Sequence, residues 1–126
     1  VCVMPEGHEL CAAQSVTFAD LAAAPLITHN PTIQFGKLIE SAFASAGVKP
    51  SPRIHVLQTE IACSLVRAGA GLAIVDEYTA AGGPWSGLVI KPLAQEIALA
   101  PSIARTVFDR LGTHADKFIE MLTVDD

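Results

Sequence analysis

The feature that most constrains the fold is a regular alternation of short strand-like runs with stretches of helical periodicity. Runs rich in aliphatic and β-branched residues predict strands at 1–4, 25–28, 53–57 and 72–75. The intervening stretches have apolar residues three and four apart, which is the spacing of one helix face. Strands and helices that alternate through short links favour an α/β fold with a parallel sheet and helices on its faces.

The clearest helix lies between the second and third predicted strands. Its apolar stripe consists of Phe35, Leu38, Ile39, Ala42, Phe43 and Ala46. Gly47 follows where a left-handed C-terminal cap is expected. Asn30 or Thr32 is expected to cap the start, because short polar side chains accept hydrogen bonds from the first free N–H groups.

Five further segments are expected to form helices or strands. Near the start, 15–21 predicts a single helical turn with Thr17 as its cap, and Thr59 opens a second long helix. After an expected loop at 80–84, the pattern predicts strands at 88–91 and 97–100. A last helix is expected to begin at Thr113.

Composition indicates a globular chain without a surface for nucleic acid. Of 126 residues, 51% are hydrophobic and 17% charged, a balance that builds a core. The net charge is −5, with 8 Lys and Arg against 13 Asp and Glu, and no basic cluster is present to neutralise phosphates. No apolar run approaches the roughly 20 residues that cross a bilayer. Because the first residues look like the middle of a strand, we expect the chain to be part of a longer polypeptide.

The residue types that carry catalysis or bind metals are scattered. Cys2, Cys11 and Cys63 form no C-x-x-C pair and are expected to be reduced thiols in a cytoplasmic protein. The four histidines lack the close carboxylate or histidine partners of a metal site or a general base, so surface or capping roles are expected. We therefore expect no metal, no cofactor and no enzyme activity.

The run Gly69-Ala70-Gly71 superficially suggests a dinucleotide-binding loop. The third glycine of that fingerprint is replaced by Ile74, and the glycines end a helix where the fingerprint requires them to follow a strand. A helix stop with a tight passage of the backbone is the better interpretation.

Polar residues at two strand-to-helix junctions are the best candidates for a binding site. The first junction contains Thr28, Asn30 and Thr32, and the second contains Thr59 and Glu60. In open α/β sheets, ligands bind beyond the carboxyl ends of the strands, where free helix N–H groups point outward. Such residues often do no more than cap helices, but two junctions on neighbouring strands are expected to converge on one edge.

Several segments, taken together and in order, resemble the effector-binding domain of LysR-type transcriptional regulators. They lie at Val3–Leu10, Phe18–Leu21, Pro25–Ile27, Phe43–Gly47 and Leu65–Val75, the last of which is close to the family's "L-V-x-x-G-x-G-V-A-I-V". The segments cover nearly the whole chain. The run Ile74–Ala80 is further similar to the "I-V-D-x-x-T-A" of members that respond to opines and basic amino acids.

The resemblance implies a type II periplasmic-binding-protein-like fold with two α/β lobes and an effector in the cleft between them. Residues 1–90 are then expected to form the second lobe, and residues 91–126 to cross over and return to the first. The DNA-binding winged helix-turn-helix and most of the first lobe are expected to precede this segment.

The resemblance also implies which residues face the cleft and how the protein acts. Thr28, Asn30, Thr32, Thr59 and, more weakly, Glu60 are the expected effector contacts, with the polar groups suiting a carboxylate and Glu60 a cationic group. The effector is expected to shift the conformation of a homo-oligomer that binds DNA only through the preceding domain. Alternatives are a free-standing solute receptor of a transporter, which needs both lobes, and a small α/β enzyme, which needs an acid–base pair.

Overall fold

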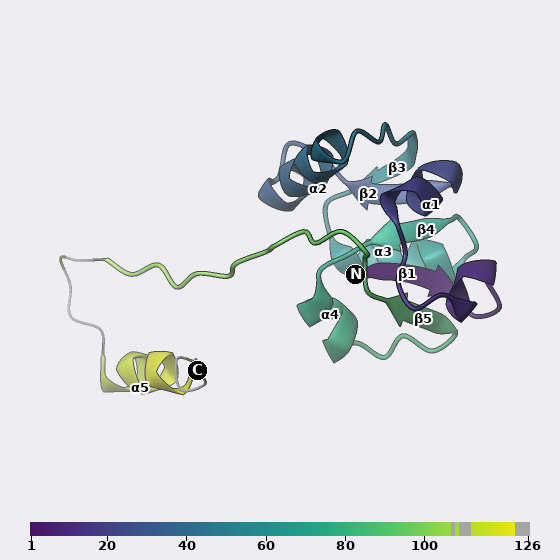
Figure 1. Ribbon diagram of the computed structural model, residues 1–126. Helices are drawn as coiled ribbons and strands as arrows, with labels where there is room; N and C mark the ends of the chain where they lie inside the picture. Colours follow the sequence, from purple (N-terminus) through teal and green to yellow (C-terminus); the bar gives the residue numbers. More distant parts are fainter. Residues whose placement is uncertain (107, 109–111, 123–126) are drawn as a thin grey trace.

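A five-stranded sheet with helices on both faces forms the body of the protein (Figure 1). The computed structural model describes residues 1–106, 108 and 112–122. The strands are β1 (Cys2–Pro5), β2 (Leu26–His29), β3 (Pro52–Val56), β4 (Leu72–Ile74) and β5 (Leu88–Lys91). The helices are the 3-10 turn η1 (Glu9–Ala12), α1 (Phe18–Ala23), α2 (Gln34–Ser45), α3 (Thr59–Arg67), α4 (Glu77–Gly82) and α5 (Thr113–Leu122).

The sheet is mixed, and the expectation of a wholly parallel sheet was wrong. The strand order is β3-β2-β4-β1-β5, in which β2 pairs in parallel with β3 and β4. Strand β1 is antiparallel to both β4 and β5. Strand β1 therefore starts at the edge where the other four strands end, and Val1 exchanges backbone hydrogen bonds with Val75 at that edge. The chain reaches and leaves the sheet at the same edge.

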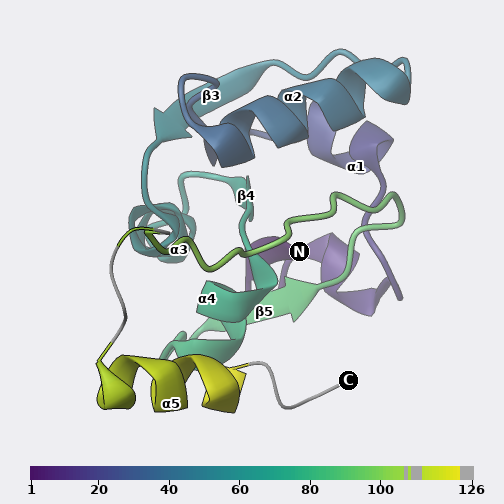
Figure 2. The same cartoon turned by 90° about the vertical axis from the view of Figure 1, so that its left-hand side faces the viewer.

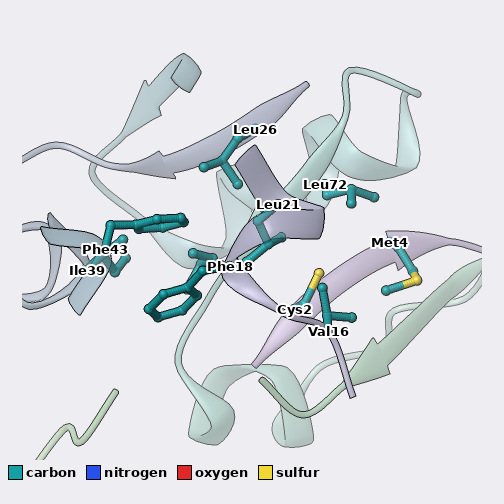
Figure 3. Packing of buried hydrophobic residues seen from close by; sticks show 10 residues of the cluster. Cys2, Met4, Val16, Phe18, Leu21, Leu26, Ile39, Phe43 and Leu72 are labelled. Atoms are coloured by element: carbon teal, nitrogen blue, oxygen red, sulfur yellow. The ribbon is translucent and has the colours of Figure 1, made fainter. Parts of the chain in front are cut away.

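Each face of the sheet has its own apolar core, because alternate strand residues point to opposite faces. On one face, α1 and α2 pack against side chains that include Cys2, Leu26 and Leu72, and the rings of Phe18 and Phe43 stack at 4.4 Å (Figure 3). On the other face, α3 and α4 cover Val3, Ile27, Val56, Ala73 and Val75. The helices thus cover both faces of the sheet and leave open the edge where β2, β3 and β4 end.

Local signals at three helix ends are confirmed. Thr17 caps α1 in a capping box, in which its hydroxyl accepts from Asp20 N and Asp20 accepts from Thr17 N. Gly47, after α2, has a φ of +67°. Gly69, after α3, has a φ of +81°. These residues end their helices because glycine adopts the left-handed conformation without a Cβ clash.

Two other expectations were wrong. Residues 97–100 form no strand and pair with neither edge strand of the sheet, β3 or β5. The expected loop at 80–84 begins too early, since α4 runs to Gly82 after Asp76 caps it. Before residue 97 the chain still touches the body, where Phe18 N donates to Gln95 Oε1 at 3.1 Å and Val16 bridges to Leu93.

Helix α5 begins at Thr113 as expected, and it stands away from the body (Figure 1). Figure 2 looks at the protein from the side on which α5 lies. Its apolar side chains are open to solvent, with Phe118 60%, Met121 78% and Leu122 58% exposed. Among the described residues, none of the helices is long and apolar enough to cross a membrane.

The passage of Gly71 beside β2 gives a test of the fold. A Cβ at Gly71, where φ is +148°, would overlap the backbone carbonyl of Pro25. We expect Gly71→Ala to lower the free energy of unfolding by about 3 kcal/mol, because strain and a backbone clash add. Gly69→Ala is the matched control, since its Cβ would meet nothing within 4 Å. That variant should lose only about 1 kcal/mol, the cost of the left-handed conformation. Equal losses in urea denaturation would contradict the close passage.

Candidate functional site

The carboxyl ends of β2, β3 and β4 meet at one edge of the sheet, and the starts of α2, α3 and α4 follow there. Both predicted junctions lie at this edge. Asn30 N donates to Val56 O at 2.8 Å, which ties the end of β2 to the end of β3. The convergence expected from strand order is therefore present, and it brings Asn30 and Thr32 near the start of one helix and Thr59 and Glu60 to the start of the next.

Asn30 and Thr32 shape a turn before α2 and do not cap that helix, so the expected cap was wrong. Asn30 Oδ1 accepts from Thr32 N at 2.9 Å and from Thr32 Oγ1 at 2.8 Å. The cap position is Ile33, which has no side-chain bond to the helix. A side chain as short as asparagine satisfies the backbone two residues on before it can reach the helix.

Two of the three helices at the edge therefore start without a side-chain cap. The start of α3 at Gln58 also lacks one, whereas Asp76 accepts from Thr79 N at 2.8 Å and caps α4. The first N–H groups of α2 and α3 have no partner within their own helices and carry partial positive charge. Gly36 allows the first turn of α2 to lie against the backbone of Asn30, which a Cβ at this position would overlap. The edge thus presents donors suited to a carboxylate.

A buried chain of hydrogen bonds links the three strand ends. Thr59 Oγ1 donates to Asp76 Oδ2 at 2.7 Å, and His29 Nε2 lies 3.4 Å from the same hydroxyl oxygen. The Thr59 hydroxyl has one proton, which it donates to the Asp76 carboxylate. His29 Nε2 must therefore carry a proton and donate it to Thr59 Oγ1. The His29 ring also packs against Phe35 with ring centroids 4.7 Å apart, which joins α2 to the cluster.

The protonation states of this cluster follow from its burial. Burial lowers the pKa of His29, although the Asp76 carboxylate and the Ile74 carbonyl act in the opposite direction. Partial burial raises the pKa of Asp76, but the hydrogen bonds from Thr59 and Thr79 together outweigh it and lower that pKa. At neutral pH the cluster is a neutral imidazole, a hydroxyl and a carboxylate.

The remaining predicted residues lie in different surroundings. Glu60 is exposed in the first turn of α3. Thr28 lies one residue inside β2, is 5% exposed, and its Oγ1 has no hydrogen-bond partner. Its side chain lies on the face covered by α2, since it is in register with His55 and alternates with Ile27. Thr28 is therefore set back from the group at the edge.

A cavity of about 270 Å³ opens at the same edge, beside the point where the chain leaves the body. Its polar lining residues are Asp76, Glu77, Tyr78 and Glu96. Phe35 and Leu93 are among its apolar lining residues. The carboxylates of this cavity and the N–H groups at the starts of α2 and α3 together suit a ligand with a cationic end and an anionic end.

Sequence reasoning missed His29 and Asp76 as parts of the site. Asp76 could have been found from the pattern Asp-x-x-Thr before α4, which is a capping signal. His29 gives no such signal, because its partner is thirty positions away. His8 accepts from Leu10 N at 3.2 Å, which confirms its expected capping role, but the surface or capping role expected for His29 was wrong because that residue is buried. Among the described residues, no group of three or more His, Cys, Asp or Glu could hold a metal ion.

Comparison with known proteins gives a consistent result. The sequence model of the LysR substrate binding domain matches residues 1–124. The chain is 29% identical over 105 residues to the transcriptional activator protein LysR of Escherichia coli K12, covering 83% of this chain and 34% of that protein. It is 29% identical over 126 residues to OccR of Rhizobium meliloti, an octopine catabolism/uptake operon regulatory protein, covering 94% of this chain and 41% of the relative.

The solved structure of HinK, a LysR family transcriptional regulator from Pseudomonas aeruginosa, matches with a TM-score of 0.78. The match covers 94% of this chain and 42% of that one at 21% identity, which shows the fold alone. The fold is α/β of the type II periplasmic-binding-protein-like kind. The chain spans well under half the length of these relatives.

The Thr59 hydroxyl gives a test of the buried cluster. We expect Thr59→Val to lower the free energy of unfolding by about 2 kcal/mol, because the carboxylate of Asp76 and the His29 ring lose a shared partner. Thr59→Ser keeps the hydroxyl and should retain most of that stability. Urea denaturation of both variants measures the difference. A valine variant as stable as the serine variant would show that the hydroxyl does not bind the cluster together.

The lowered pKa of His29 predicts a loss of stability in mild acid. The unfolded chain takes up a proton at about pH 6.5, but the folded chain does so only at lower pH. Stability should therefore fall as the pH drops from about 6.5 towards the folded pKa, while Asp76 stays ionised. His29→Gln should flatten this part of the curve. NMR titration of the His29 ring at or above pH 6.5 would be inconsistent with its burial.

Proposed function

The chain belongs to the LysR substrate binding domain family, and we propose that it is the greater part of the effector-sensing domain of a bacterial LysR-type transcriptional regulator. The observation that carries the proposal is the open sheet edge, where two uncapped helix starts and a polar cluster converge. The effector contacts proposed there are Asn30, Thr32, Thr59 and Glu60, and Thr28 leaves the set that the sequence predicted because it lies under α2, set back from the edge. The family comparison favours this role over a free-standing solute receptor.

We propose that residues 1–90 are the second lobe and that residues 91–126 cross over and return to the first. The chain leaves the sheet at the cleft edge after Lys91, as a hinge requires. The exposed apolar face of α5 suits burial against a lobe that this chain does not include. The DNA-binding domain belongs to the same absent part, in keeping with the net charge of −5.

The proposed mechanism is a shift in population between two lobe arrangements. An effector that contacts both lobes favours the closed arrangement by its difference in affinity for the two. The crossing segments at Val1 and Lys91 lie beside this edge and transmit the motion. A homo-oligomer that pairs through the effector domain, in the cytoplasm, then passes the change to DNA. This role requires no cofactor and no catalytic step, and the family is one of regulators.

The effector we propose is amino-acid-like, in the manner of a basic amino acid or an opine. Its carboxylate is expected at the uncapped start of α2, where no described residue accepts from the Asn30 amide NH₂. Its cationic group is expected on the side of Glu60 and the acidic cavity. The likeness to OccR over nearly the whole chain supports an effector of this chemistry.

A thermal-shift screen of the two-lobed domain containing this chain tests the proposal. Amino acids, opines and aromatic acids are compared, and a ligand at a hundredfold excess over its Kd should stabilise by about 2.7 kcal/mol. Stabilisation by aromatic acids alone would contradict the proposed effector class. Turnover of any of these compounds would contradict the regulator itself.

Variants of the same domain refine the test. Glu60→Gln should weaken a cationic effector about tenfold, because a charge-assisted hydrogen bond is lost, and leave neutral ligands unchanged. Glu9→Gln is the matched control, since Glu9 follows β1 at the opposite edge of the sheet. Equal losses for both ligand types would remove Glu60 from the proposed site.

A further inference from the structure

A larger cavity lies between α2 and the strands β2 and β3, and at one end it reaches His29, Pro31 and Gly36 at the sheet edge. Its volume is about 590 Å³, within the range of roughly 300–1,000 Å³ that small-molecule sites occupy. The strands form its floor, α2 one wall, and the loop after α2 the other. The apolar lining includes Leu26, Ile39, Phe43, Val48 and Pro50. We call this space the α2–β3 cavity.

The floor of the cavity holds a polar atom that the fold leaves without a partner. Thr28 lines the cavity, is 5% exposed, and its Oγ1 makes no hydrogen bond with the described residues. The neighbouring floor residues Leu26 and Pro52 are apolar and offer it none. Buried hydroxyls are normally paired, so an unpaired one facing a cavity indicates a missing occupant.

The charges at the cavity determine which chemistry suits it. Glu40 and Lys49 both line it, are both exposed, and have opposite signs, so the rim favours neither an anion nor a cation. His55 is exposed on the strand side. An ionised group there would lose its hydration, and the unpaired buried atoms of the lining residues, Thr28 Oγ1 and His29 Nδ1, carry no charge to offset that loss. A neutral oxygen loses much less and can pair with Thr28.

We propose that the α2–β3 cavity is a second small-molecule site, which takes an uncharged, mainly apolar compound with one hydroxyl or carbonyl oxygen bonded to Thr28 Oγ1. This goes beyond the proposed function, because the occupant differs in chemistry from a zwitterionic effector. The site is built wholly within this chain and needs no second lobe. Its occupant lies against α2, whose start forms part of the sheet edge, so occupancy is coupled to the position of that helix.

The test compares two probes that differ by one oxygen atom. The chain is titrated with p-cresol and with toluene while amide NMR signals of α2, β2 and β3 are followed. We expect p-cresol to bind about fivefold more tightly than toluene, the effect of one neutral hydrogen bond. Thr28→Val should abolish that difference by weakening p-cresol alone. Thr32→Val, which removes a hydroxyl at the sheet edge, is the matched control and should change neither probe.

Two outcomes would overturn the proposal. Equal affinities of both probes for the wild-type chain would show that the Thr28 hydroxyl selects no ligand. Shifts confined to 30–35 and 58–60 would place binding at the sheet edge. Ala44→Trp narrows the cavity from its exposed rim and provides a second variant, which should block both probes. Because the proposed effector is tested with the two-lobed domain, failure of one test does not decide the other.

Discussion

Parallel pairing of β2 with β3 and β4 is the interaction on which the rest of the structure depends. It brings three strand ends to one edge and makes each of the following helices start there. Strand β1 runs the other way, so the chain also reaches and leaves the sheet at this edge. The proposed effector contacts and the proposed crossing segments thus share one edge of the sheet. A ligand at the edge is in a position to act on both.

The sheet edge combines a buried hydrogen-bonded cluster with helix starts that lack side-chain caps. Thr59, Asp76 and His29 are bonded to one another beneath the surface, where a neutral imidazole and a carboxylate are stable together. Above them, the starts of α2 and α3 have no side-chain caps. A fold stabilised by its own buried contacts can leave such donors to a ligand. The chain covers less than half the length of LysR and OccR, in keeping with the proposal that the edge is one side of a cleft.

Prediction from sequence succeeded where the deciding contacts are local. The capping box at Thr17 and the stop at Gly47 depend on residues within four positions, and both are present. It failed where a competing contact or a distant partner decided. Asn30 bonds to Thr32 before it can reach α2, and residues 97–100 pair with neither edge strand of the sheet. The placement of Thr28 under α2 follows from register, which periodicity alone does not give.

The sequence by itself determined the alternation of the first four strands with helices, the cap of α1, the glycine stops of α2 and α3 and the family, because these depend on spacing, caps and short motifs along the chain. It also determined that polar residues follow two adjacent strands. Only the tertiary structure decided that β1 is antiparallel, that His29 meets Thr59 and Asp76, and that Thr28 faces a cavity under α2. The reason is physical: these contacts join residues far apart in the chain, and packing of whole elements determines which of them meet.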